Sequence, residues 1–140
     1  MLEEYAFPGG FAVFMKKMAP PFAPLVTTNF AIIINGLFLL LCVSAALVGA
    51  RVPEFGLSVA ALLGINGVTH ALGAIRSRGY APGLLTGVLL YLPLAILVYY
   101  LSVGSGELSV GQGVGAFFLG AAYQLAPIGC LGIEYLFRRA

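Results

Sequence analysis

Charged residues are scarce in this sequence. Lys, Arg, Asp and Glu make up 9% of its 140 residues, whereas a soluble domain has about 25%. Hydrophobic residues make up 61%, which excludes a water-soluble fold and indicates an integral membrane protein. The formal net charge of +2 is small, and the basic residues lie at the ends of apolar runs instead of forming a patch. Nucleic acid is therefore not expected as a partner.

Cysteines that could form a disulfide or a metal cluster are also lacking. The two cysteines, Cys42 and Cys130, lie inside apolar runs and form no CxxC motif or Cys/His cluster. Their expected depths place them in opposite halves of the membrane, which argues against a disulfide between them. We interpret both as small packing residues.

Long apolar runs are what the sequence has in abundance. Four of them reach the ~20 residues that a helix needs to cross the hydrocarbon core. They cover residues 29–48, 55–75, 83–103 and 111–137, and short polar segments separate them. The sequence predicts an all-α fold, a polytopic transmembrane helical bundle of about four spans in which all 140 residues form a single membrane domain.

Residues 1–28 are expected to form a partial or interfacial helical segment on the cytoplasmic side. The Phe7-Pro8-Gly9-Gly10 sequence and a proline-rich link interrupt this segment too often for a complete span. It also lacks the basic start and cleavage site of a signal peptide.

The distribution of positive charge predicts the orientation of the chain. Short loops rich in Lys and Arg stay in the cytoplasm. Arg51 alone falls on one side of the predicted spans, and six basic residues fall on the other: Lys16, Lys17, Arg76, Arg78, Arg138 and Arg139. The N-terminal segment, the loop after residue 75 and the C-terminus are therefore expected to be cytoplasmic.

Three polar side chains are expected at a similar depth in the cytoplasmic half. His70 lies six residues before Arg76, roughly 9 Å inside the boundary, and Asn66 is one turn deeper on the same helix face. Asn35 reaches a comparable depth from the first span. Polar groups in hydrocarbon often mark a site, but each can instead hydrogen-bond a neighbouring helix, and both interpretations stay open.

Carboxylates and small residues allow further predictions. Glu3 and Glu4 form either a solvated end or the acidic half of a site. Glu134 precedes Arg138 by four residues, which favours an ion pair on one helix. Small residues on two spans predict close helix packing: Ala60, Gly64, Gly67 and Ala71 on the second, and Gly111 and Gly115 on the fourth. These small-residue faces also make a homo-oligomer or a larger membrane complex plausible.

Two motifs in the first part of the chain resemble a known family. The run Glu3-Glu4-Tyr5-Ala6-Phe7-Pro8-Gly9-Gly10-Phe11 looks like the core of the HXXEE-motif family of bacterial membrane proteins. After Asn66 and His70, the pattern Tyr-x-Pro-Gly-x-x-Thr is similar to that of the family, and it comprises Tyr80, Pro82, Gly83 and Thr86. The resemblance covers roughly residues 2–93 and implies a multi-pass protein of the bacterial cytoplasmic membrane.

This chain departs from the family motif at its leading histidine, which would fall immediately before Met1. The family also implies a further span upstream, so we expect the chain to be part of a five-span protein.

Metal binding is the leading functional hypothesis. In the family motif a His and two Glu project from one helix face, and here Glu3 and Glu4 with His70 are the expected ligands and catalytic groups. Such ligands suit zinc or iron, and Asn35 and Asn66 would complete a polar substrate site. The alternatives are a proton-coupled carrier that uses the same residues as a relay and a structural subunit of a membrane complex. The family itself implies no established activity.

Overall fold

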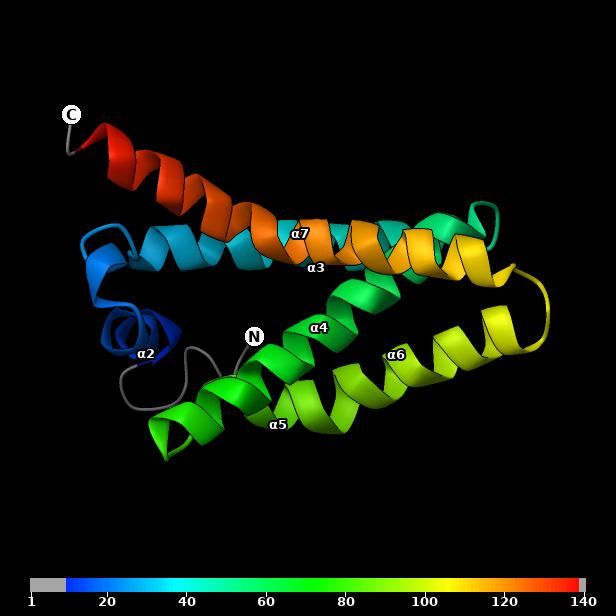
Figure 1. Cartoon of the computed structure of the whole chain (residues 1–140), viewed down its shortest axis with the longest axis horizontal. Coiled ribbons are helices and arrows are strands. Elements are labelled where there is room, and N and C mark those ends of the chain that lie inside the picture. Colours follow the sequence, from blue (N-terminus) through cyan, green and yellow to red (C-terminus); the bar gives the residue numbers. More distant parts are fainter. Residues whose placement is uncertain (1–9, 139–140) are drawn as a thin grey trace.

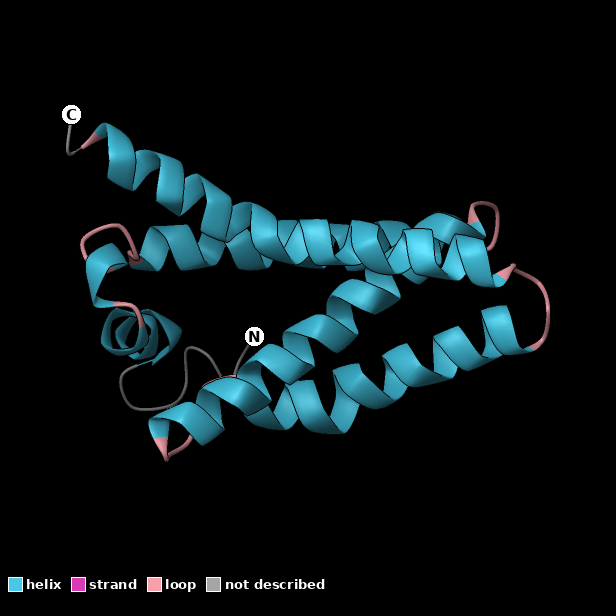
Figure 2. Ribbon diagram, viewed as in Figure 1, coloured by secondary structure: helices cyan, strands magenta, loops and turns pink. Residues whose placement is uncertain are grey.

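The computed structural model describes residues 10–138, and in this part of the chain all regular secondary structure is helical (Figures 1 and 2). The elements in chain order are α2 (Gly10–Met18), η1 (Pro20–Phe22), α3 (Thr28–Val48), α4 (Pro53–Ser77), α5 (Leu84–Thr86), η2 (Gly87–Tyr91), α6 (Leu92–Tyr99), η3 (Tyr100–Gly104) and α7 (Val110–Phe137).

Four helical stretches in the described residues are long and apolar enough to cross a membrane. They are Thr28–Val48, Pro53–Ser77, Leu84–Gly104 and Val110–Phe137. The third stretch is continuous and is made of α5, η2, α6 and η3. Every end lies within two residues of its predicted position, so the predicted all-α architecture of a multi-pass membrane protein is confirmed.

Local sequence signals explain where three of these spans begin. Thr27 caps α3, because its hydroxyl accepts a hydrogen bond of 3.1 Å from the amide of Phe30. Pro53 is the first residue of α4. A backbone N–H at this position would have no partner within the helix, so its absence in proline costs nothing. Ser109 and Gln112 form a reciprocal capping box at the start of α7.

The prolines inside the third and fourth spans have different surroundings. Pro93 follows η2, a π-helical segment. Proline cannot donate to the carbonyl four residues earlier and its ring crowds that carbonyl, so a widened turn just before it accommodates the ring. Pro127 lies inside α7, which remains helical through it. The C-terminal part of α7 diverges from α4 in Figure 1.

Helix α4 is the centre of the bundle. Half of its apolar stretch is buried, against 6%, 11% and 17% for the other three spans. Residues 57–63 are buried without interruption, which means that neighbours surround this half of α4 on every side. Helix α7 and the third span, from α5 to α6, pack along α4. Helix α3 contacts α4 less extensively. The outer helices present large apolar side chains outward, as a lipid environment requires.

Glycines set the closest helix contacts. A Cβ atom built on Gly67 would lie 2.6 Å from the carbonyl oxygen of Gly87, and one built on Gly64 would lie 3.0 Å from the Ala95 Cβ. These contacts confirm Gly64 and Gly67 as packing positions on α4.

The small residues predicted for packing on α7 do not contact another helix in the described part of this chain. A Cβ on Gly115 would meet nothing within 4 Å, and one on Gly111 would meet only the Ser109 hydroxyl at 3.9 Å. The face of α7 that approaches α4 carries Gly120 instead, where a Cβ would lie 2.5 Å from the Ser58 carbonyl oxygen. Several faces of α7 carry glycine, and spacing alone could not identify the one that meets α4.

Candidate functional site

His70 is the best defined of the predicted site residues. It lies on α4 with only 7% of its surface exposed. A Cβ built on Gly83 would lie 2.5 Å from the His70 Cε1 and 2.8 Å from each ring nitrogen. The three distances place this Cβ over the face of the imidazole at Cε1, so one face of the ring packs directly against Gly83.

The loop after α4 brings Gly83 beneath the histidine. Helix α4 ends at Ser77, and its C-cap residue Arg78 adopts a left-handed conformation with φ of 50°. Ala81, Pro82 and Gly83 are all buried, and Gly83 has φ of 91°, a conformation that only glycine adopts readily. The Tyr-x-Pro-Gly-x-x-Thr pattern is thus a turn that leads the chain back under His70 and into α5.

Helix α2 reaches the same end of α4. A Cβ built on Gly73 would lie 3.2 Å from the ring of Phe14 and 3.8 Å from the Cβ of Ala81. Gly73 follows His70 by three residues, less than one turn. The N-terminal segment therefore packs beside the part of the fold that holds the histidine.

Asn66 is turned toward the fourth span. Its amide nitrogen donates a long hydrogen bond of 3.4 Å to the side-chain oxygen of Gln124 on α7, and Asn66 itself is half-buried. His70 meets Gly83 in the loop before α5, so the contacts of these two predicted neighbours lead to different elements. Sequence reasoning missed Gln124, although an amide in the middle of the apolar run of the fourth span was a usable signal.

Asn35 lies on α3 and is half-buried. It precedes Phe38 by three residues, and Phe38 contacts Tyr91 at the end of η2 with 5.7 Å between ring centroids. Asn35 is thus near the face of α3 that meets the third span. Its convergence with Asn66 and His70 on one site stays a prediction.

The carboxylates of the predicted site, Glu3 and Glu4, lie outside the described residues. Within residues 10–138, no three His, Cys, Asp or Glu side chains are grouped closely enough to hold a metal ion. Glu134 forms the predicted ion pair with Arg138 at 2.6 Å, and Glu54 accepts a hydrogen bond of 2.7 Å from Gln112. In the described part, His70 is therefore the one predicted metal ligand.

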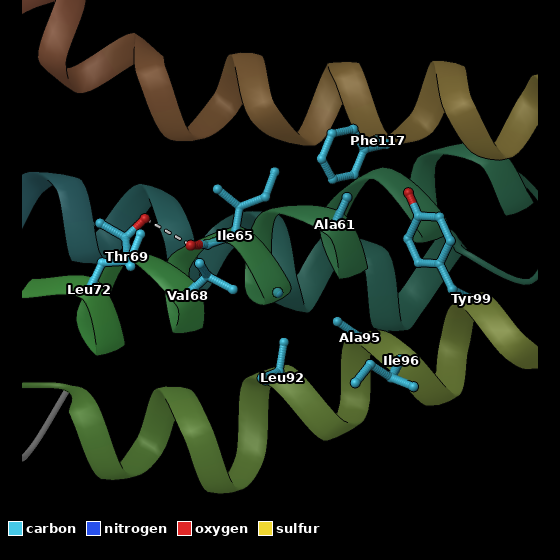
Figure 3. Close-up of a pocket in the computed structure, with 11 residues that line it drawn as sticks. Ala61, Ile65, Val68, Thr69, Leu72, Leu92, Ala95, Ile96, Tyr99 and Phe117 are labelled. Carbon is cyan, nitrogen blue, oxygen red and sulfur yellow. Dashed lines mark hydrogen bonds between the residues drawn. The ribbon is translucent and has the colours of Figure 1, made fainter. Parts of the chain in front are cut away.

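The opposite face of α4 borders an apolar groove of about 510 Å³ between α4, α6 and α7 (Figure 3). Val68 lies in the groove wall, and His70 follows it by two residues, about 200° further around the helix. The polar groups at the groove bond to the protein itself: Thr69 donates to the Ile65 carbonyl at 2.8 Å, and Tyr99 donates to the Gly113 carbonyl at 3.3 Å. The groove and the histidine are separate features.

The contact between Asn66 and Gln124 allows a quantitative prediction. Hydrogen bonds between membrane helices contribute about 0.6 kcal/mol on average, and this one is long. We expect Asn66→Leu and Gln124→Leu each to lower the free energy of unfolding by less than about 1 kcal/mol. A double-mutant cycle in detergent micelles measures the coupling, and a value well above about 2 kcal/mol would contradict the weak coupling expected of this long hydrogen bond.

Comparison with known proteins supports the motif-based resemblance. Residues 1–98 match the family model described as "Protein of unknown function with HXXEE motif". Searches of curated proteins and of solved structures found no match. The matched region contains the first three spans up to α6, including His70 and the turn at Gly83. The chain therefore belongs to the HXXEE family of proteins of unknown function.

Proposed function

We propose that Glu3, Glu4 and His70 bind one divalent metal ion, zinc or iron, and that the protein is a membrane-embedded, metal-dependent enzyme. The observation that carries the proposal is the placement of His70. The imidazole is buried on a membrane-spanning helix, and a glycine with positive φ leaves room for its ring. Ionisable side chains within spans commonly belong to functional sites.

The position of α2 supports a contribution from the two glutamates. Phe14 packs against Gly73, less than one turn from His70. Glu4 precedes Gly10, the first residue of α2, by six residues, and a segment of this length can span up to about 20 Å. The glutamates are therefore within reach of the histidine without any rearrangement of the described helices.

The donor set fits the proposed metals in its chemistry. Imidazole nitrogen and carboxylate oxygen are common ligands of zinc and of non-haem iron. His70 supplies one ligand, so the fit depends on both Glu3 and Glu4. A bound ion would supply Lewis acidity for hydrolysis or activation of oxygen. Asn35 and Asn66 would orient a polar group of the substrate from α3 and α4.

Elemental analysis of the purified protein tests this proposal. We expect stoichiometric zinc or iron in the wild type and at least a tenfold loss in Glu4→Gln and His70→Ala, because each removes a ligand. Glu107→Gln is the matched control, since it neutralises a carboxylate in the loop before α7. Metal-free wild type would favour the proton-coupled carrier or the structural subunit, and equal loss in all three variants would indicate misfolding.

The orientation of the chain is part of the same proposal. The charge distribution supports a bacterial cytoplasmic-membrane protein with the loop after α4 and the C-terminus in the cytoplasm. In a background without Cys42 and Cys130, we expect an impermeant maleimide to label Ser105→Cys in intact cells. It should label Ser77→Cys only after lysis, and the reverse pattern would invert the topology.

Association with a second copy or a larger complex is also a proposal. Gly111 and Gly115 lie on a face of α7 where an added Cβ would meet no other helix among residues 10–138, which leaves a small-residue surface for another helix. Native mass spectrometry of the intact protein tests it. A monomer that persists at high protein concentration would contradict the homo-oligomer.

A further inference from the structure

The apolar groove between α4, α6 and α7 runs lengthwise along α4. Its α4 wall begins at Ala61, continues through Val68 and ends at Leu72, and α6 supplies the opposite wall (Figure 3). Phe117 and Tyr99 lie at the end nearest Ala61. The rise of a helix places Leu72 roughly 16 Å from Ala61, which is about the thickness of one leaflet of a ~30 Å hydrocarbon core.

A positive charge lies at the Leu72 end of this groove. Arg76 follows Leu72 by four residues, so the two share the helix face that borders the groove. Side chains on a helix tilt toward its N-terminus, which directs the Arg76 side chain back over Leu72. Arg76 is exposed, and no carboxylate in the described part of the chain pairs with it.

The groove surface itself offers nothing to a polar ligand. Its walls are almost entirely apolar, and the hydroxyls of Thr69 and Tyr99 donate to backbone carbonyls. The groove therefore suits a hydrocarbon chain, while the guanidinium at its end suits a phosphate group, which arginine binds through two parallel hydrogen bonds. These two features belong together in an anionic phospholipid.

We infer that this groove is a binding site for one anionic phospholipid, with an acyl chain along α4 and α6 and the phosphate at Arg76. A tail one leaflet long fills the distance between Leu72 and Ala61. The site lies on the side of α4 opposite His70, so it does not depend on the proposed metal. It also does not depend on the orientation of the chain, because the charge and the groove lie on the same helix.

Lipid retention by the intact protein tests this site. The protein is placed in nanodiscs made of equal parts phosphatidylglycerol and phosphatidylcholine and is then extracted in mild detergent. Native mass spectrometry measures the mass of the protein with any lipid that stays bound. We expect one phosphatidylglycerol to remain bound with at least about a fivefold preference over phosphatidylcholine. Arg76→Gln should abolish this preference, so that the two lipids are retained about equally. Arg51→Gln is the control: it removes one charge near the other end of α4 and should leave the preference unchanged.

A second variant tests the groove separately from the charge. Val68 is 44% exposed, so Val68→Phe would fill the groove without disturbing buried contacts, and we expect it to lose the bound lipid of either kind. Leu89→Phe is the control, because Leu89 is 71% exposed on the third span and outside the groove. Equal retention in Val68→Phe and wild type, or the same preference in Arg76→Gln and wild type, would overturn the site. A dimer mass that Val68→Phe abolishes would also overturn it and assign the groove to a second copy of the chain.

Discussion

Gly83→Ala is expected to lower the free energy of unfolding by about 2–5 kcal/mol. A left-handed conformation costs a non-glycine residue about 1–2 kcal/mol, and Gly83 has φ of 91°. The new methyl group would also lie 2.5 Å from the His70 Cε1, and overpacking of this kind costs about 1–3 kcal/mol. Thermal or denaturant unfolding in detergent micelles measures the sum.

Gly106→Ala separates these two contributions. Gly106 has φ of 82°, and a Cβ there would meet nothing within 4 Å. This variant should show only the backbone cost of about 1–2 kcal/mol. In the double variant His70→Ala/Gly83→Ala the steric part should disappear, so that its cost is lower than the sum of the single variants by about 1–3 kcal/mol. Equal costs at Gly83 and Gly106 would contradict the contact between the glycine and the histidine.

Gly120→Leu is expected to separate α7 from α4. A Cβ at this position would lie 2.5 Å from the Ser58 carbonyl oxygen and 2.8 Å from the Leu62 amide nitrogen. Both atoms belong to the backbone of the central helix, so no side chain can rotate away. We expect a loss of at least about 3 kcal/mol in the free energy of unfolding, measured by the same unfolding assay.

Gly115→Leu is the matched control on the same helix. A Cβ at Gly115 meets nothing within 4 Å in this chain, so in the monomeric protein the leucine would point into lipid and change stability by less than about 0.5 kcal/mol. Equal destabilisation by the two variants would show that α7 meets its neighbours through another face, such as one that associates with a second copy.

The sequence predicted the spans well because two independent signals coincide at their ends. Apolar runs of membrane length begin close to Thr27, Pro53 and Ser109, where local signals start the helices. The central place of α4 was less evident, although α4 is the least hydrophobic of the four spans and α3, the most hydrophobic, is the least buried. In a membrane the most apolar helix faces lipid, and the more polar one with small residues lies inside.

The candidate site was predicted only in part. His70 is buried as an intramembrane ionisable residue should be, but spacing could not reveal that Asn66 turns toward Gln124 and His70 toward Gly83. Those contacts depend on how α5 and α7 cross α4, which follows from long-range packing. Pro93 is visible in the sequence, but the π-helical segment before it is not.

X-ray absorption spectroscopy of the zinc-loaded protein, with any purification tag removed, tests the central claim most directly. His70 is the single histidine of the chain, so an imidazole ligand can come only from it. We expect one nitrogen ligand at about 2.0–2.1 Å with carboxylate oxygens at about 2.0–2.2 Å, and loss of the imidazole signal in His70→Ala. A spectrum without imidazole, or one dominated by sulfur at about 2.3 Å from Cys42 or Cys130, would contradict the proposed site.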